Sequence, residues 1–163
     1  MILASKLLNL AQKKLMRYKS ASPNLDARIL LAYCLGLKDN YFKFDKKVSN
    51  DKQILFENLI QNRIDGKPVS RITSKKSFWK DEFYINSHCL DPRPDSEIII
   101  ESVINSLNQK KLENFNILDL GTGSGCLILS ILREFSKAKG IATDISIGAI
   151  EVAKLNSKKL KLF

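Results

Sequence analysis

One acid and three glycines stand at every second position in one stretch of the chain, Asp119-Leu-Gly-Thr-Gly-Ser-Gly125. An apolar run precedes it and an apolar, helix-compatible run follows, which is the pattern of a strand, a tight turn and a helix start. Glycines permit positive φ and let a ligand approach the backbone where a Cβ would block it. Ser124 is the predicted N-cap of a helix over Gly125–Phe135, whose free N–H groups would face the ligand. The stretch therefore predicts a loop for a nucleotide-like ligand.

A second acid, Asp144, ends the next β-prone segment, Gly140–Asp144. A carboxylate at the end of a second strand can accept hydrogen bonds from the two ribose hydroxyls of an adenosine. The spacing D-x-G-x-G-x-G differs from the dinucleotide pattern G-x-G-x-x-G. Together with Asp144 it resembles motif I of the class I S-adenosylmethionine (SAM) methyltransferases. The alternative is an ordinary glycine turn of an α/β protein, which leaves the two acids in register unexplained.

The composition bounds the remaining possibilities. With 163 residues, 44% hydrophobic and 27% charged, the chain has room for one domain, or for a small domain and part of another. The net charge of +10 is concentrated at the N-terminus, where residues 1–66 carry 12 Lys/Arg against 6 Asp/Glu. That excess suits an acidic or RNA-associated partner, and a lysine-rich solvated surface explains it equally well.

Cysteine spacing and hydropathy exclude several kinds of site. The three cysteines are far apart and form no C-x-x-C, so we expect neither a disulfide framework nor a metal site. No apolar run reaches about 18 residues, and the N-terminus lacks the pattern of a signal peptide. We therefore expect a cytoplasmic protein that does not contact a membrane.

The N-terminal elements are predicted to be helical. Apolar residues recur at helical spacing over about 3–17, from Asn24 to a stop at Gly36, and behind a cap at Asn50 or Asp51. A short turn or helix covers Asp39–Phe44. These segments predict a small helical bundle over residues 1–65.

The elements after the bundle lead into the glycine loop. Phe78-Trp79 and Phe83-Tyr84-Ile85 are short β-prone runs that predict a hairpin bridging the bundle to the following residues. Pro92-Arg93-Pro94 then precedes a helix, and it holds Arg93 between two rigid residues. Ser146 is the predicted cap of the last helix.

Several of these segments, taken in order, resemble the signatures of the HemK/PrmC family, the protein-(glutamine-N5) methyltransferases that modify peptide chain release factors. The matching segments are LDARILLAYCLG at 25–36, RIDGKPV at 63–69, Phe78-Trp79 with Phe83, PRPDSE at 92–97, motif I at 117–128 and Asp-Ile-Ser at 144–146. Departures are Asp95 and Ser96 for Glu and Thr, Arg71 for an aromatic residue and Asp91 for an aliphatic one.

The resemblance implies an α/β fold with an N-terminal helical bundle, a β-hairpin bridge and the first β-α-β-α units of a Rossmann-like class I methyltransferase sheet, truncated. It implies that residues 1–66 dock on a release factor, that 67–93 form a linker and hairpin, and that 94–163 begin the SAM-binding domain. The basic bundle would bring the protein close to the ribosome or its RNA.

The resemblance also implies SAM as cofactor, no metal, and methylation of the glutamine of the release-factor GGQ motif in translation termination. The loop would wrap the methionine part of SAM, Asp119 would lie near its ammonium group, and Asp144 would bind the ribose. The implied cofactor-binding residues are Asp119, Gly121, Thr122, Gly123, Ser124, Gly125 and Asp144.

One family motif does not occur in this sequence. Family members hold the substrate amide with an Asn-Pro-Pro-Tyr motif, and these 163 residues contain none. No catalytic residue is assigned for that reason, and we expect a fragment or a truncated product without methyltransferase activity of its own. The alternatives are a non-catalytic module that binds release factors and a fragment of an RNA methyltransferase.

Overall fold

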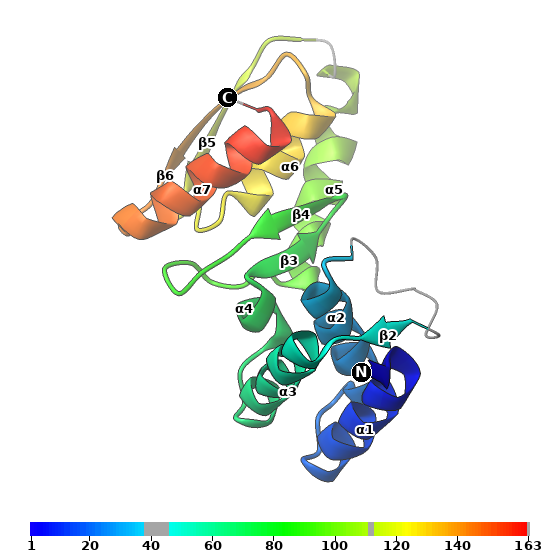
Figure 1. Cartoon of the computed structure of the whole chain (residues 1–163). Helices are drawn as coiled ribbons and strands as arrows, with labels where there is room; N and C mark the ends of the chain where they lie inside the picture. The colour runs from blue at the N-terminus through cyan, green and yellow to red at the C-terminus, as the bar shows by residue number, and fades with distance from the viewer. Residues whose placement is uncertain (38–45, 111–112, 163) are drawn as a thin grey trace. The chain divides into compact units, whose positions relative to one another are not determined.

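The computed structural model describes residues 1–37, 46–110 and 113–162, and the chain divides into two compact units, Met1–Thr73 and Ser74–Phe163 (Figure 1). The division falls within residues 67–93, the segment expected to be linker and hairpin. The turn expected over Asp39–Phe44 lies outside the described residues. The roles expected for residues 1–66, 67–93 and 94–163 remain predictions.

The first unit is a helical bundle, as the apolar periodicity predicts. Its helices are α1 (Ala4–Arg17), α2 (Pro23–Leu35), α3 (Asn50–Ile64) and the short α4 (Val69–Thr73). Gly36 ends α2 at a φ of 70°, the left-handed conformation that glycine adopts at low cost. The N-cap of α3 is Ser49, one residue before the predicted cap.

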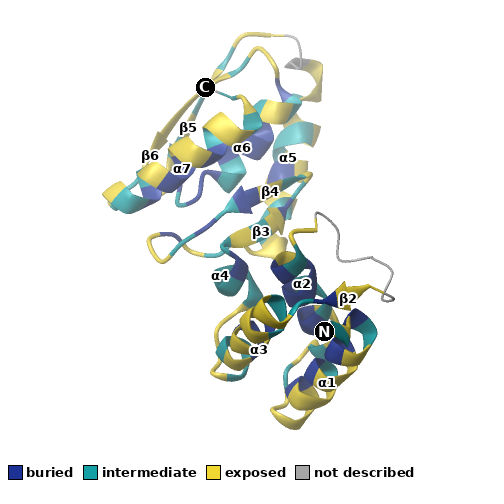
Figure 2. Ribbon diagram, viewed as in Figure 1, coloured by how far each residue is buried: buried dark blue, intermediate teal, exposed yellow. Residues whose placement is uncertain are grey.

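A short pair of strands was not expected in this unit. β1 (Ile2–Leu3) and β2 (Lys47–Val48) pair antiparallel and tie the start of α1 to the segment before α3. The buried faces of the helices meet in one core (Figure 2), which includes Ala4, Leu7, Leu8, Ala11, Leu15, Ala27, Leu30, Leu31, Val48, Phe56, Leu59 and Ile60.

An ionic cluster closes the bundle between α2 and α3. The Asp26 carboxylate accepts from Arg63 Nε at 2.7 Å and from the Ser20 hydroxyl at 2.8 Å. Asp26 is only 7% exposed, so its charge needs these partners to be tolerated there.

The second unit begins with the predicted hairpin, β3 (Lys75–Phe78) and β4 (Asp81–Tyr84), which pair antiparallel. A 3₁₀ turn, η1 (Pro94–Ser96), leads into α5 (Glu97–Leu107), which η2 (Asn108–Lys110) follows. β5 (Asn116–Leu120), α6 (Cys126–Glu134), β6 (Lys139–Thr143) and α7 (Ile147–Leu160) complete the described part. This element order matches the predicted β-α-β-α arrangement.

The hairpin is fastened to the helices at its turn. The Trp79 backbone N–H donates to Glu97 Oε1 on α5 at 2.8 Å, and its indole N–H donates to Glu134 Oε1 on α6 at 2.9 Å. Phe78 and Phe83 are fully buried in one core with Ile100, Ile128 and Phe135. The hairpin is therefore part of the second unit's core.

The two longer strands pair in parallel, with Ile117 opposite Gly140 and Asp119 opposite Ala142. α6 covers one face: a Cβ at Gly140 would lie 2.8 Å from side-chain atoms of both Ile128 and Leu132. The other face is exposed, with Leu118, Leu120 and Ile141 at 60%, 74% and 65%. Apolar strands of this kind are typically buried on both faces, whereas one face lies open here.

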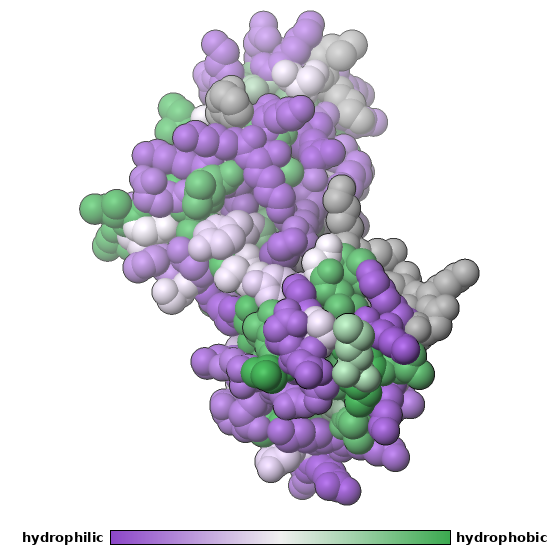
Figure 3. Space-filling model, viewed as in Figure 1, coloured by the Kyte–Doolittle hydropathy of each residue, from purple (hydrophilic) through white to green (hydrophobic). Residues whose placement is uncertain are grey.

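Apolar atoms also gather on the surface at the N-terminal end of α7 (Figure 3). Ile145 and Ile147, which flank Ser146 there, are 102% and 81% exposed. None of the helices in the described ranges is long and apolar enough to cross a bilayer.

Candidate functional site

The glycine loop connects β5 to α6 at the carboxyl end of the strand pair. Gly121, Gly123 and Gly125 have φ values of 79°, 56° and 78°. A left-handed conformation costs a residue with a side chain free energy that glycine avoids, which explains the alternate glycine spacing. The Gly121 and Thr122 N–H groups both donate to the Thr143 carbonyl at 2.9 Å, so the loop folds back over the end of β6.

The three glycines differ in what surrounds them. A Cβ built on Gly121 meets no atom within 4 Å, and one on Gly123 meets only the Cys89 Cβ, at 3.9 Å. A Cβ on Gly125 would lie 3.0 Å from Leu129 Cδ1 and 3.2 Å from the Ala153 Cβ. Gly121 therefore borders open space that a ligand can enter, whereas Gly125 allows α6 and α7 to pack closely.

Both acids, Asp119 and Asp144, are hydrogen-bonded to residues of the loop. Asp119, near the end of β5, accepts from the Thr122 hydroxyl at 2.7 Å. Asp144, directly after β6, accepts from the Gly123 N–H at 2.8 Å through Oδ2 and from the Ser146 N–H at 2.9 Å through Oδ1. The structure thus brings both acids, which are 25 positions apart in the sequence, to the same loop.

Asp144 is held as an anion. The backbone N–H groups of Ser146 and Gly123 lower the pKa of its carboxyl below its usual range, against a smaller opposing effect of burial. Hydrogen bonds that favour the charged form lower a carboxyl pKa. Each oxygen keeps a free lone pair, so this carboxylate can also accept from ligand hydroxyls.

The predicted cap of α6 is wrong. Gly125 occupies the N-cap position and Ser124 makes no capping hydrogen bond, because the left-handed turn at Gly125 comes between Ser124 and the helix. Thr122 and Ser124 are 6% and 2% exposed, so their side chains do not face the open side of the loop. The predicted cap at Ser146 is confirmed: its hydroxyl accepts from the Ala149 N–H at 3.3 Å.

The thiol at the start of α6 is Cys126, which is partly buried. Burial raises the pKa of Cys126, and contact with the Ser124 hydroxyl opposes part of that rise. Because the thiolate is the nucleophilic form, this rise in pKa disfavours a role for Cys126 as a nucleophile.

The segment after the hairpin covers the loop, which the sequence patterns did not predict. Cys89 lies over Gly123, and the His88 ring lies against the first turn of α7, where a Cβ on Gly148 would fall 2.4 Å from His88 Cγ. Gly148 is therefore needed for this contact. No spacing rule connects His88 to Gly148, because they lie on segments 60 positions apart.

Asn156 is a second residue that sequence reasoning missed. It is 1% exposed, and its side-chain amide donates to the Ser124 carbonyl at 2.8 Å. A signal was present: it continues the buried α7 stripe of Ala149, Val152 and Ala153, where a polar residue calls for a specific partner.

Arg93 lies exposed at the N-cap of η1, where its carbonyl accepts from the Ser96 N–H at 3.0 Å. The buried Pro92 and exposed Pro94 flank it. In the structure, the Pro92-Arg93-Pro94 segment therefore leads into η1 and α5.

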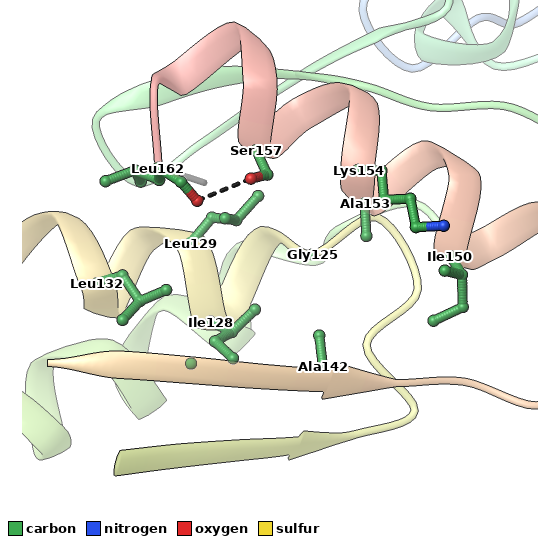
Figure 4. A pocket seen from close by; sticks show the side chains of 11 residues that line it. Gly125, Ile128, Leu129, Leu132, Ala142, Ile150, Ala153, Lys154, Ser157 and Leu162 are labelled. Carbon is green, nitrogen blue, oxygen red and sulfur yellow. Dashed lines mark hydrogen bonds between the residues drawn. The ribbon is translucent and has the colours of Figure 1, made fainter. Parts of the chain in front are cut away.

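A cavity of about 200 Å³ lies behind the loop, among α6, β6 and α7 (Figure 4). Its lining is mostly aliphatic, with Ile128, Leu129, Leu132 and Ile150 around it. Ligand pockets for drug-sized molecules run from about 300 Å³ upward. This space, whose lining includes the exposed Gly140 and Lys154, is separate from the candidate site, which is the open side of the loop at Gly121.

The arrangement can bind a polar ligand but shows no chemical machinery of its own. Within residues 1–37, 46–110 and 113–162, no three His, Cys, Asp or Glu residues are grouped to hold a metal ion. The loop offers backbone approach at Gly121 and Gly123, flanked by the carboxylates of Asp119 and Asp144. Such a site orients a ligand that brings its own reactive group.

Comparison with known families divides the chain in the same way. Residues 6–73 match the model of the PrmC N-terminal domain, and residues 100–162 match that of ribosomal protein L11 methyltransferase (PrmA). The first match covers nearly all of the helical unit, and the second covers the glycine loop and both acids.

Curated relatives match nearly the whole chain. A bifunctional methyltransferase of Rickettsia typhi is 39% identical over 94% of this chain and 33% of its own length. Release factor glutamine methyltransferases of Agrobacterium fabrum and Shewanella oneidensis are 34% and 37% identical, over 91% and 88% of this chain and 53% and 50% of theirs. The chain thus spans about a third to a half of the length of these relatives.

Proposed function

Because the chain belongs to the HemK/PrmC family of methyltransferases, we propose that its second unit binds SAM at the glycine loop and that the protein methylates the glutamine N5 of the GGQ motif in release factors. The observation that carries the proposal is the loop itself. Its three glycines have positive φ, and Gly121 borders open space that a ligand can enter. The anionic Asp144 accepts a hydrogen bond from the nearby Gly123 N–H.

The residues fit SAM in shape and charge. The open space at Gly121 admits the methionine part against the backbone. Asp119 carries the negative charge that an ammonium group needs nearby, and the lone pairs left on Asp144 can accept from ribose hydroxyls. Gly123 is half-buried beside Cys89, and Thr122, Ser124 and Gly125 form the buried side of the loop.

Bound SAM would supply the electrophilic methyl group on its sulfonium. An amide nitrogen is a poor nucleophile because its lone pair is delocalised, so the protein's contribution is to align that nitrogen rather than to provide a strong base. In this proposal the helical unit docks the release factor.

The test combines binding and transfer. Isothermal titration calorimetry of the chain with SAM measures the site, with Asp144→Ala as the matched loss-of-site variant. Radiolabelled SAM with a release factor, with the same factor carrying Gln→Ala in its GGQ motif, and with bulk RNA measures transfer and acceptor class. Equal SAM affinity of the unsubstituted chain and of Asp144→Ala refutes the proposed SAM site. Labelling of RNA alone refutes the release-factor assignment.

A second candidate is binding without transfer. The observation that favours it is the separate helical unit, residues 1–73, which has its own core and matches the PrmC N-terminal domain over residues 6–73. In this case the chain binds a release factor through its helical unit but transfers no label. Co-sedimentation with the release factor, measured beside the transfer assay, separates the two functions.

A further inference from the structure

Asn156 is a buried polar residue with every side-chain hydrogen-bonding atom close to a partner. Its Oδ1 accepts from the Tyr84 N–H at 2.7 Å, and its Nδ2 donates to the Tyr84 carbonyl at 2.9 Å and to the Ser124 carbonyl at 2.8 Å. A single side chain on α7 therefore joins the end of hairpin strand β4 to the glycine loop.

Both polar groups of the peptide between Ser124 and Gly125, its carbonyl and its N–H, are hydrogen-bonded. Asn156 holds its carbonyl oxygen, and the Thr122 carbonyl accepts from its N–H at 2.8 Å. This peptide needs fixing, because glycine populates positive and negative φ almost equally and so opposes a rotation of the peptide plane only weakly. A rotated plane would break the hydrogen bond from the Gly125 N–H to the Thr122 carbonyl and change φ at Gly125, the N-cap of α6.

We propose that Asn156 is a positioning residue for the cofactor loop, which it holds in the conformation that binds SAM. The inference rests on the proposed function for the identity of the ligand, and on the three hydrogen bonds alone for the control of the loop. Asn156 does not touch the open side of the loop, since it approaches the Ser124 carbonyl from the buried side. It acts through the Ser124–Gly125 peptide.

Packing alone does not explain an asparagine at this position. Its neighbours on the α7 stripe, Ala149, Val152 and Ala153, are apolar, and a leucine has a similar shape. An apolar residue would leave the Tyr84 and Ser124 carbonyls buried without this donor, which is costly. The same reasoning gives the matched control: Val152, also 1% exposed on α7, packs against the core without a hydrogen-bonding side chain.

The experiment compares Asn156→Ala, Asn156→Leu and Val152→Ala in the 163-residue chain. The ¹⁵N–¹H resonances of Gly121, Gly123 and Gly125 report the loop conformation without ligand. Calorimetry with S-adenosylhomocysteine reports the affinity, and thermal unfolding reports the loss of stability. Asn156→Leu keeps a side chain of similar shape but removes all three hydrogen bonds, so it serves if the cavity left by alanine prevents folding.

We expect both Asn156 variants to shift the glycine resonances and to weaken S-adenosylhomocysteine binding by about tenfold or more, the effect of one good hydrogen bond. Val152→Ala should lower the unfolding temperature while leaving the resonances in place and the affinity within about twofold. Unmoved glycine resonances in the Asn156 variants, or an equal loss of affinity in Val152→Ala, would overturn the positioning role. If the unsubstituted chain binds no ligand, the proposed function fails, and the ligand-free resonances still decide whether Asn156 controls the loop.

Discussion

Alanine at Gly121 and at Gly125 should separate ligand binding from stability. Both residues have a left-handed φ, near 79° and 78°. In that conformation a side chain costs about 1–2 kcal/mol. Alanine also restricts the unfolded chain more than glycine does, which offsets about 0.4–1 kcal/mol of that cost. The backbone contribution is therefore nearly the same at the two positions.

The surroundings make the difference. At Gly121 the added methyl meets nothing within 4 Å, so the net loss of stability is only about 0–1.5 kcal/mol. At Gly125 the methyl lies 3.0 Å from Leu129 Cδ1 and 3.2 Å from the Ala153 Cβ, and overpacking of this kind adds about 1–3 kcal/mol. Gly125→Ala should therefore lose about 1–4.5 kcal/mol in all.

Ligand binding should show the reverse order. The Gly121 methyl occupies the open space where SAM approaches in the proposed function, so Gly121→Ala should weaken binding by about tenfold or more. Gly125→Ala, measured at a temperature where it is still folded, should bind more nearly like the unsubstituted chain because its methyl points into the core.

Trp79 provides a probe of the second unit alone. It is the single tryptophan of the chain, and its indole is hydrogen-bonded to Glu134. Urea unfolding followed by its fluorescence therefore reports the unit that holds the loop, and calorimetry with S-adenosylhomocysteine reports the site. Equal destabilisation by the two substitutions, or unchanged binding in Gly121→Ala, would refute this account of the loop.

Three further predictions concern the acids. Asp144→Ala should weaken SAM binding by about 1–3 kcal/mol; calorimetry showing unaltered affinity would contradict the ribose-binding role. Since the folded state lowers the pKa of Asp144, the stability it contributes is complete above the ordinary aspartate pKa of about 4 and is lost as pH falls through its lower folded-state value; Asp144→Asn should flatten that part of a pH–stability curve followed by Trp79 fluorescence. Arg63→Ala should cost the helical unit about 3 kcal/mol by leaving Asp26 buried without its cation. The part of the helical circular dichroism that comes from α1–α3 should then be lost before the Trp79 fluorescence changes, and coincident, unchanged transitions would argue against it.

Local patterns in the sequence sufficed for most elements. The helical period predicted α1, α2 and α3, the β-prone aromatic runs predicted the hairpin, and alternate glycines after an apolar run predicted the turn between β5 and α6. These features depend on residues within a few positions of one another, so their cause is visible in the order of the amino acids. The error at Ser124 arose because its type suits a cap while the left-handed Gly125 follows it.

The assembly of the site depended on contacts between distant residues. Asp144 reaches Gly123, Asn156 reaches Ser124 and Tyr84, and His88 fits against Gly148 only because parallel pairing and helix packing bring four separate segments together. The sequence by itself determined that a glycine loop with two acids exists. Tertiary structure alone decided that Gly121 faces open space while Gly125 faces the core, because the same residue type and the same φ are distinguished only by the neighbours that the fold supplies.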